Sequence, residues 1–321
     1  MIVSTGVHSP TPMRHSTVVA EIRSGVGLRR QGGVGRGLLR TARPGHWVKN
    51  GLVFAAPFAG GALRHGAAIR QSLLAAVAFC LAASGTYLIN DATDAERDRL
   101  HPTKRFRPIA AGEVPAGLAR IVAVMLLVLA IGVASVVSAP TAGIIGTYIA
   151  LTLSYSLWLK HIAVVDVVAV ASGFLLRAIG GAVATHVPAS GPFLALASFG
   201  ALFVVVGKRE GERIALGDGA AAHRASLASY STAFTAQLLS LALTATVLSY
   251  ASWAFNIDAD EPGIPWLALS VIPFVIAMLR ATQLVLLGGG AEPEELILRD
   301  RGIQLAAVST GVLLALGLYV V

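Results

Sequence analysis

Four polar residues at regular spacing form the stretch of the sequence best suited to chemistry. Asn90, Asp91, Asp94 and Asp98 are separated by one to four residues, and the last three share one face of a helix. Like charges at that spacing repel each other, so the arrangement is favourable where a divalent cation neutralises them. Hard oxygen ligands with room for water predict Mg²⁺, held by the three aspartates and bridging phosphates of a substrate that Asn90 also contacts.

Cations follow these acids directly. Lys104, Arg105 and Arg107 lie in a short segment bounded by proline and glycine. Cations beside carboxylates suit a diphosphate, because a metal can bind some of its oxygens while Lys and Arg bind others. Two simpler hypotheses remain open. The acids could form a solvated helix end that pairs with Arg97 and Arg99, and the cations could belong to an ordinary positively charged loop.

Further candidate residues lie near the ends of apolar segments. Asp166 stands alone among valines and is a candidate catalytic residue, because ionisable groups in apolar segments are usually functional. A structural ion pair between Asp166 and Arg177 is the alternative, and a solvated loop is the alternative for 207–213. The other candidates for substrate binding are polar or cationic: Lys49, Asn50, Tyr155, Lys160, Lys208 and Arg209.

The elements that must position these residues are membrane-spanning helices. Hydrophobic residues make up 55% of the 321-residue chain and charged residues only 13%, whereas soluble domains are about 25% charged. The sequence therefore predicts an all-α, polytopic membrane protein, because helices satisfy their backbone hydrogen bonds internally. Nine segments are candidate spans: 46–63, 67–92, 115–138, 140–159, 162–185, 190–208, 230–255, 264–287 and 302–321.

The distribution of positive charge predicts the orientation. Lys and Arg concentrate in alternate connections, which places the N-terminus and the polar blocks at the cytoplasmic face of the inner (plasma) membrane. The net charge of +8 is explained in this way, so no nucleic-acid partner is expected. Residues 1–43 hold seven arginines and one acid and are expected to be a disordered basic tail. Residues 44–321 are expected to form the transmembrane catalytic domain.

The motif formed by Asn90, Asp91, Asp94 and Asp98 resembles the first aspartate motif of the UbiA superfamily of intramembrane prenyltransferases. That resemblance implies a nine-helix bundle whose cytoplasmic polar motifs hold Mg²⁺ and a diphosphate. Val170 departs from the second Asp-x-x-x-Asp motif of the prenyl-transferring members. Segments similar to a phosphoribosyl-transferring branch are 43–50, 104–112, 155–166, 207–212 and 298–301.

This branch implies transfer of 5-phosphoribose from phosphoribosyl diphosphate to a polyprenyl phosphate in the synthesis of cell-wall arabinan precursors. The alternatives are a prenyltransferase that acts on an aromatic acceptor and a transporter, although the clustering of charges at one face speaks against transport. The sequence leaves open whether the chain forms homo-oligomers. The implied roles are diphosphate binding by Lys104, Arg105 and Arg107, 5-phosphate binding by Lys160, Lys208 or Arg209, and lipid-phosphate binding by Lys49.

Overall fold

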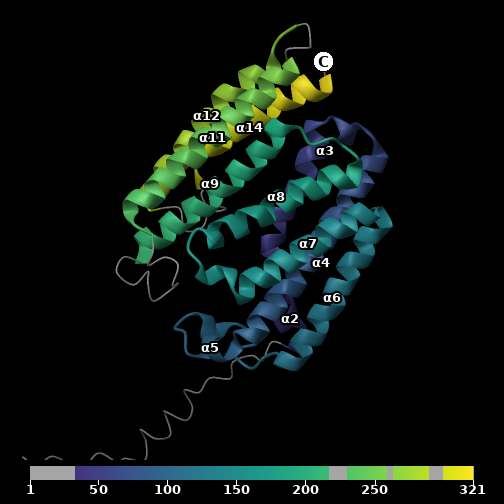
Figure 1. Ribbon diagram of the computed structural model, residues 1–321, viewed down its shortest axis with the longest axis vertical. Coiled ribbons are helices and arrows are strands. Elements are labelled where there is room, and N and C mark those ends of the chain that lie inside the picture. The colour runs from purple at the N-terminus through teal and green to yellow at the C-terminus, as the bar shows by residue number, and fades with distance from the viewer. Residues whose placement is uncertain (1–32, 217–229, 259–262, 289–298, 321) are drawn as a thin grey trace, which may run out of the picture.

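The computed structural model describes residues 33–216, 230–258, 263–288 and 299–320, and these residues form helices without any strand (Figure 1). The all-α prediction is therefore confirmed. The N-terminal third contains α2 (Val34–Ala42), the 3₁₀ helix η1 (Pro44–Phe54), α3 (Ala55–Ala59), η2 (Ala62–Arg64), α4 (Gly66–Thr93), α5 (Ala95–Arg99) and η3 (Lys104–Phe106).

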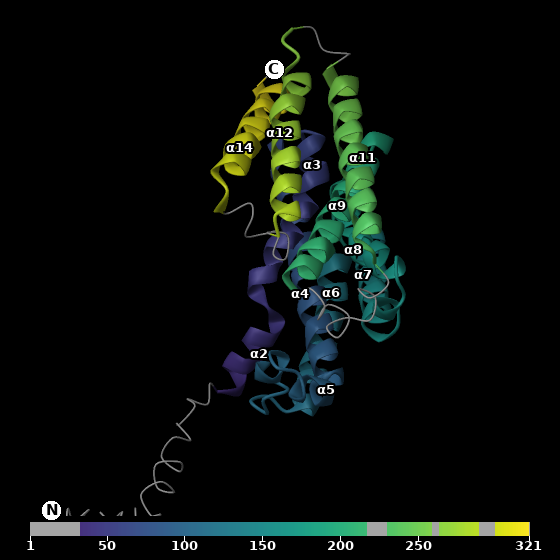
Figure 2. The ribbon, with the colours of Figure 1, turned by 90° about the vertical axis from the view of Figure 1, so that its left-hand side faces the viewer.

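The remaining helices follow in chain order. They are α6 (Ala116–Val137), α7 (Ala139–Leu157), η4 (Leu159–His161), α8 (Val165–Thr185), α9 (Gly191–Leu216), α11 (Thr232–Asp258), α12 (Trp266–Leu286), α14 (Arg301–Ala315) and the final turn η8 (Leu316–Val320). Figure 2 shows α2 and α5 at one end of the molecule and the C-terminus near the other.

Seven helical segments of the described residues are long and apolar enough to cross a membrane. They correspond to seven of the nine predicted spans, so the count of nine is approximate. The predicted span 140–159 forms the 19-residue α7, which packs between α6 and α8 and is less apolar than the seven. The predicted span 46–63 is broken into η1 and α3, because glycines and Pro57 interrupt a continuous helix.

Helix ends follow local sequence signals. Ser138 precedes α7 and its hydroxyl accepts a hydrogen bond from the Thr141 backbone N–H, while Pro140 occupies the first turn. Asp300 caps α14 in the same way, because its carboxylate accepts from the Ile303 N–H at 2.9 Å. Arg280 donates to the same carboxylate, and this guanidinium lowers the pKa of Asp300 below its ordinary value.

Helix α8 lies at the centre of the N-terminal half, where it packs against η1, α3, α4, α7 and α9. Small residues make this packing possible. A Cβ atom on Gly181 would lie only 1.8 Å from the backbone oxygen of Val53 in η1, and a Cβ on Gly180 would overlap the Phe79 ring. The contact between Gly181 and the backbone of η1 therefore sets the distance between α8 and the segment that carries Lys49 and Asn50.

The Gly181→Ala variant is expected to lose several degrees of thermal stability in detergent, because η1 must move to admit the methyl group and overpacking typically costs about 1–3 kcal/mol. Gly132→Ala in α6 is the matched control, since nothing lies within 4 Å of the added Cβ. Thermal unfolding of the two variants checks this, and equal midpoints would contradict the proposed close contact.

Candidate functional site

A polar cavity of about 690 Å³ lies among η1, the ends of α4 and α7, the 97–107 segment, η4 and α8. Its lining is strongly positive. Among the described residues, seven Lys and Arg side chains and two Asp side chains border it, an excess of five positive charges. The cations are Arg43, Lys49, Arg97, Lys104, Arg107, Lys160 and Arg177, and the acids are Asp94 and Asp98.

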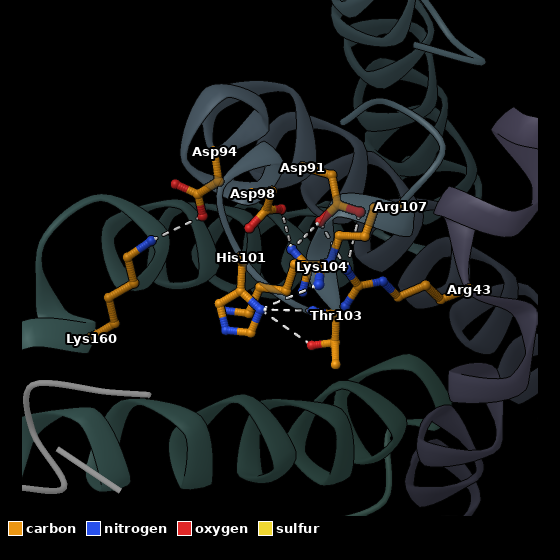
Figure 3. A network of polar contacts seen from close by, with 9 residues as sticks. All are labelled: Arg43, Asp91, Asp94, Asp98, His101, Thr103, Lys104, Arg107 and Lys160. Carbon is orange, nitrogen blue, oxygen red and sulfur yellow. Dashed lines mark hydrogen bonds and ion pairs between the residues drawn. The ribbon is translucent and has the colours of Figure 1, made fainter. Parts of the chain in front are cut away.

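Two arginines and two aspartates form an ion-pair network in the wall of the cavity (Figure 3). Arg43 Nη2 lies 2.8 Å from Asp91 Oδ1, and Arg107 Nη1 lies 3.2 Å from the same oxygen and 2.7 Å from Asp98 Oδ2. Asp91 and Asp98 are only 2% and 3% exposed. Buried carboxylates need such partners, because an unpaired charge out of water is costly. The network joins the start of η1, the end of α4, and α5 to the segment after η3.

Asp94 is oriented differently from its two neighbours. Its Oδ2 lies 3.3 Å from Lys160 Nζ in η4, and both side chains are about one fifth exposed. Figure 3 shows this pair apart from the arginine network. Asp94 and Lys160 are therefore a solvent-accessible ion pair that links the end of α4 to η4 across the cavity.

The predicted magnesium ligands have the carboxylate oxygens that Mg²⁺ binds, but their side chains do not gather around one position. No group of three His, Cys, Asp or Glu side chains that could hold a metal ion occurs within the described part of the chain. Asp94, Asp98 and the amide of Asn90 border the cavity, and their oxygens are of the kind that Mg²⁺ prefers. Asp91 is instead held by two guanidinium groups. The predicted metal set of Asp91, Asp94 and Asp98 stays a prediction.

The simpler hypothesis, that the aspartates form a solvated helix end paired with Arg97 and Arg99, named the wrong arginines. Arg99 Nε donates to the backbone oxygen of Ala110 at 3.3 Å, and Arg97 borders the cavity. Asp91 and Asp98 pair with Arg43 and Arg107 instead, and Asp94 pairs with Lys160. Arg43 lies at the edge of the expected tail, so its role was missed. The resemblance of segment 43–50 was a signal for Arg43, but it assigned this arginine no role.

The cavity collects some of the predicted substrate-binding residues but not all of them. Arg105 stacks on the Phe106 ring at 4.8 Å and does not border the cavity. Asn50 is buried and accepts a hydrogen bond from Arg177 Nε at 2.7 Å. Lys208 and Arg209 belong to α9 and are likewise outside the lining. The predicted binding residues that border the cavity are Lys49, Asn90, Lys104, Arg107, Tyr155 and Lys160.

Asp166 is fully buried in a second polar cluster, outside the cavity lining. It accepts a hydrogen bond from the Tyr230 hydroxyl at 2.6 Å, and its Oδ2 lies 3.4 Å from Arg209 Nε. Arg209 also contacts Glu212 at 3.1 Å. The alternative of an Asp166–Arg177 pair is wrong, because Arg177 bonds to other groups. Asp166 connects α8 to α9 and to the start of α11.

The Tyr230 hydroxyl also supports a strained turn next to η4. It accepts a hydrogen bond from the Val164 N–H at 2.6 Å. Val164 has φ 68° and ψ −47°, close to a rare γ-turn and unfavourable for a β-branched residue. Burial, followed by the hydrogen bond to Asp166, raises the pKa of Tyr230 to about 12, so the hydroxyl keeps its proton at neutral pH. This contact was not predicted from sequence.

Comparison with known proteins identifies relatives of this arrangement. The model of the UbiA prenyltransferase family matches residues 51–298. The decaprenyl-phosphate phosphoribosyltransferase of Mycobacterium tuberculosis is 46% identical over 277 residues, covering 85% of this chain and 91% of the relative. The enzyme of the same name from Corynebacterium glutamicum is 42% identical over 289 residues, covering 88% of this chain and 87% of the relative.

Solved structures show the same fold at much lower identity. A UbiA homolog from Archaeoglobus fulgidus bound to Cd²⁺ has a TM-score of 0.63 and 17% identity, covering 88% of this chain and 98% of that chain. The same homolog bound to GPP and Mg²⁺ has a TM-score of 0.59 at 17% identity, covering 89% and 100%. At this identity the likeness concerns the fold alone.

The Tyr230→Phe variant is expected to lose about 1–3 kcal/mol of unfolding free energy, because a buried N–H and a buried carboxylate each lose a partner. Glycine adopts positive φ without support, so Tyr230→Phe should cost less in a Val164→Gly background. Chemical denaturation in detergent measures both values. Strictly additive effects would show that the hydroxyl does not support the strained turn.

Proposed function

The chain belongs to the UbiA prenyltransferase family, and we propose that it transfers 5-phosphoribose from phosphoribosyl diphosphate to a polyprenyl phosphate, releasing diphosphate. The observation that carries this proposal is the charge of the cavity, whose described lining has five more cations than acids. Phosphoribosyl diphosphate and a lipid phosphate together bring three phosphate-bearing groups into one site. The relatives that are 42–46% identical carry a name that states phosphoribosyl transfer to decaprenyl phosphate.

Val170 supports this substrate over a prenyl diphosphate and an aromatic acceptor. Its side chain borders the cavity, at the position where the resemblance to prenyl-transferring members would require an acid of the second motif. An apolar residue there cannot bind a metal that holds the diphosphate. A sugar phosphate held mainly by cations does not need that second acidic motif.

The residues around the cavity suit a mechanism based on positioning and electrostatics. Lys104 and Lys160 would bind diphosphate oxygens, and Asp94 would part from Lys160 to bind the metal. Mg²⁺ held by Asp94, Asp98 and Asn90 would neutralise the negative charge that develops on the departing diphosphate. Lys49 would bind the lipid phosphate. That phosphate is already ionised at pH 7, so its oxygen attacks the anomeric carbon without a general base.

The membrane topology and the cellular role belong to the same proposal. The distribution of Lys and Arg supports a cytoplasmic cavity and a cytoplasmic N-terminus in the plasma membrane. A soluble sugar diphosphate would then enter from the cytoplasm and the lipid from the bilayer. The product, a lipid-linked phosphoribose, fits the synthesis of cell-wall arabinan precursors. Residues 1–32, most of the expected basic tail, lie outside the described residues.

Incubation of the purified protein with Mg²⁺, a polyprenyl phosphate and radiolabelled phosphoribosyl diphosphate tests the reaction. We expect label in the extracted lipid, and we expect EDTA to abolish it. Intact protein that labels no lipid, beside an active control enzyme, would overturn the proposal. A prenyl diphosphate with a 4-hydroxybenzoate-like acceptor would then be the next substrate pair.

The Asp94→Ala variant is expected to lose about 100-fold or more of this activity, because the carboxylate borders the cavity and serves the departing diphosphate. It should still fold, since Asp94 contributes only one ion pair, which is about one fifth exposed and in contact with solvent. Glu113→Ala is the control, because Glu113 pairs with Arg40 outside the cavity. Near-normal turnover in folded Asp94→Ala protein would refute this role.

A further inference from the structure

Arg177 is a buried cation whose position the proposed reaction does not yet use. It lies within α8, one of the candidate spans, and is only 7% exposed, yet it borders the cavity. Its Nε donates to Asn50 Oδ1 at 2.7 Å, its Nη1 to the backbone oxygen of Gly173 at 2.7 Å, and its Nη2 to the Tyr148 hydroxyl at 2.9 Å. All three acceptors are neutral.

The protein supplies Arg177 with neighbours that orient it without neutralising it. Within the described parts of the chain, Arg177 takes part in no ion pair with a carboxylate. Its guanidinium carbon lies 4.7 Å from the centre of the Tyr148 ring, 5.6 Å from that of Phe174 and 5.8 Å from that of Phe79. Aromatic faces attract a cation, but they leave its net charge in place.

A guanidinium at this depth with no counter-ion is energetically costly. Three hydrogen bonds use three of its five N–H donors, so two donors remain. Asn50 is itself fixed, because its amide nitrogen donates to Cys80 Sγ at 3.0 Å. The site is thus a rigid, positively charged donor group at the edge of a polar cavity, and its missing component is an anion.

We propose that Arg177, together with Lys49, binds a phosphate monoester group at the inner end of the cavity. Lys49 borders the same cavity, and its Nζ lies 6.0 Å from the centre of the Phe174 ring that also faces Arg177. The planar guanidinium suits two phosphate oxygens at once. The site rests on the proposed function and deepens it. The group is the 5-phosphate of the sugar donor or the phosphate of the polyprenyl acceptor.

The position of this site along the helices separates it from the acidic end of the cavity. Cys80, which contacts Asn50, precedes Asp91 by eleven residues of the same α4 helix, a rise of about 16 Å. The cavity therefore has an outer end with Asp94, Asp98, Lys104 and Lys160, and an inner end with Arg177. An outer end that holds both acids and lysines and an inner end that holds a buried cation suit a reaction that brings a metal-bound diphosphate and a second phosphate group together.

The Asn50→Asp variant tests the proposal, because it places a carboxylate beside Arg177 Nε with almost no change in volume. If Arg177 served only the fold, an internal counter-ion would leave ligand binding unaffected. If Arg177 binds a phosphate, the new carboxylate should weaken that ligand by about 10- to 100-fold. Arg177→Gln and Lys49→Met are second variants that remove the cations directly. Arg64→Gln is the control, since Arg64 is exposed and contacts the backbone of Leu318.

Binding is measured as ligand-induced thermal stabilisation in phosphatidylcholine nanodiscs, with ribose 5-phosphate or farnesyl phosphate as the probe and inorganic diphosphate as the reference. Loss of the ribose 5-phosphate effect alone in the variants, with the diphosphate effect retained, supports the site and assigns it to the sugar donor. Loss of the farnesyl phosphate effect alone supports the site and assigns it to the lipid.

Folded Asn50→Asp and Arg177→Gln proteins that keep the wild-type response to both probes would overturn the site, as would wild-type protein that responds to neither. This readout needs no turnover, so it separates the two proposals. If the wild-type protein transfers label normally and the variants bind both probes normally, only the phosphate site is refuted. If the wild-type protein binds a probe through Arg177 but transfers no label to lipid, only the proposed reaction is refuted.

Discussion

The ion-pair network of Arg43, Asp91, Arg107 and Asp98 is the interaction on which the site depends. It ties three segments together: the turn that precedes η1, the end of α4 with α5, and the segment after η3. Of the three, only the end of α4 belongs to a long helix that packs against several others. Breaking one member would leave a buried charge without its partner, which typically costs about 3–5 kcal/mol. The walls of the cavity therefore depend on charges that bind each other.

Carboxylates close in sequence thus have separate uses. Asp91 is buried between Arg43 and Arg107 and is neutralised within the protein, whereas Asp94 forms an accessible pair with Lys160. Asp98 pairs with Arg107 through Oδ2 and also borders the cavity. A pair in contact with water can be exchanged for a ligand at low cost, because water compensates the opened charges. The buried pairs that Asp91 forms with the two arginines cannot be exchanged in this way. Arg177 differs from these carboxylates. It is a buried cation that neutral groups orient, so its charge remains available to an anion from outside the protein.

Much of the fold could be predicted from the sequence, because a span needs about 20 apolar residues and this requirement is local. The all-α bundle and the polar block around Asp94 follow from such local patterns. The close approach of Gly181 to Val53 depends on packing between distant segments. No spacing along the chain specifies such contacts.

The site was predictable only in its composition. Charge counts identify cations near the acids, but they do not say which cation binds which acid. Arg43 reaches Asp91 across 48 positions, and Tyr230 reaches Asp166 across 64. The isolation of Asp166 among valines suggested function, yet its partners Tyr230 and Arg209 satisfy it within the protein. An acid that is isolated in the sequence can receive its hydrogen-bond and ion-pair partners from residues that lie close to it only after folding.

The central claim, that the cationic cavity binds phosphoribosyl diphosphate, is tested most directly by an experimental structure of the protein in nanodiscs with Mg²⁺ and an unreactive analogue of that substrate. The account predicts the diphosphate beside Asp94 and Lys160, with the pair between Arg43 and Asp91 intact. Density for the analogue outside the cavity, or an empty cavity at saturating analogue, would contradict it.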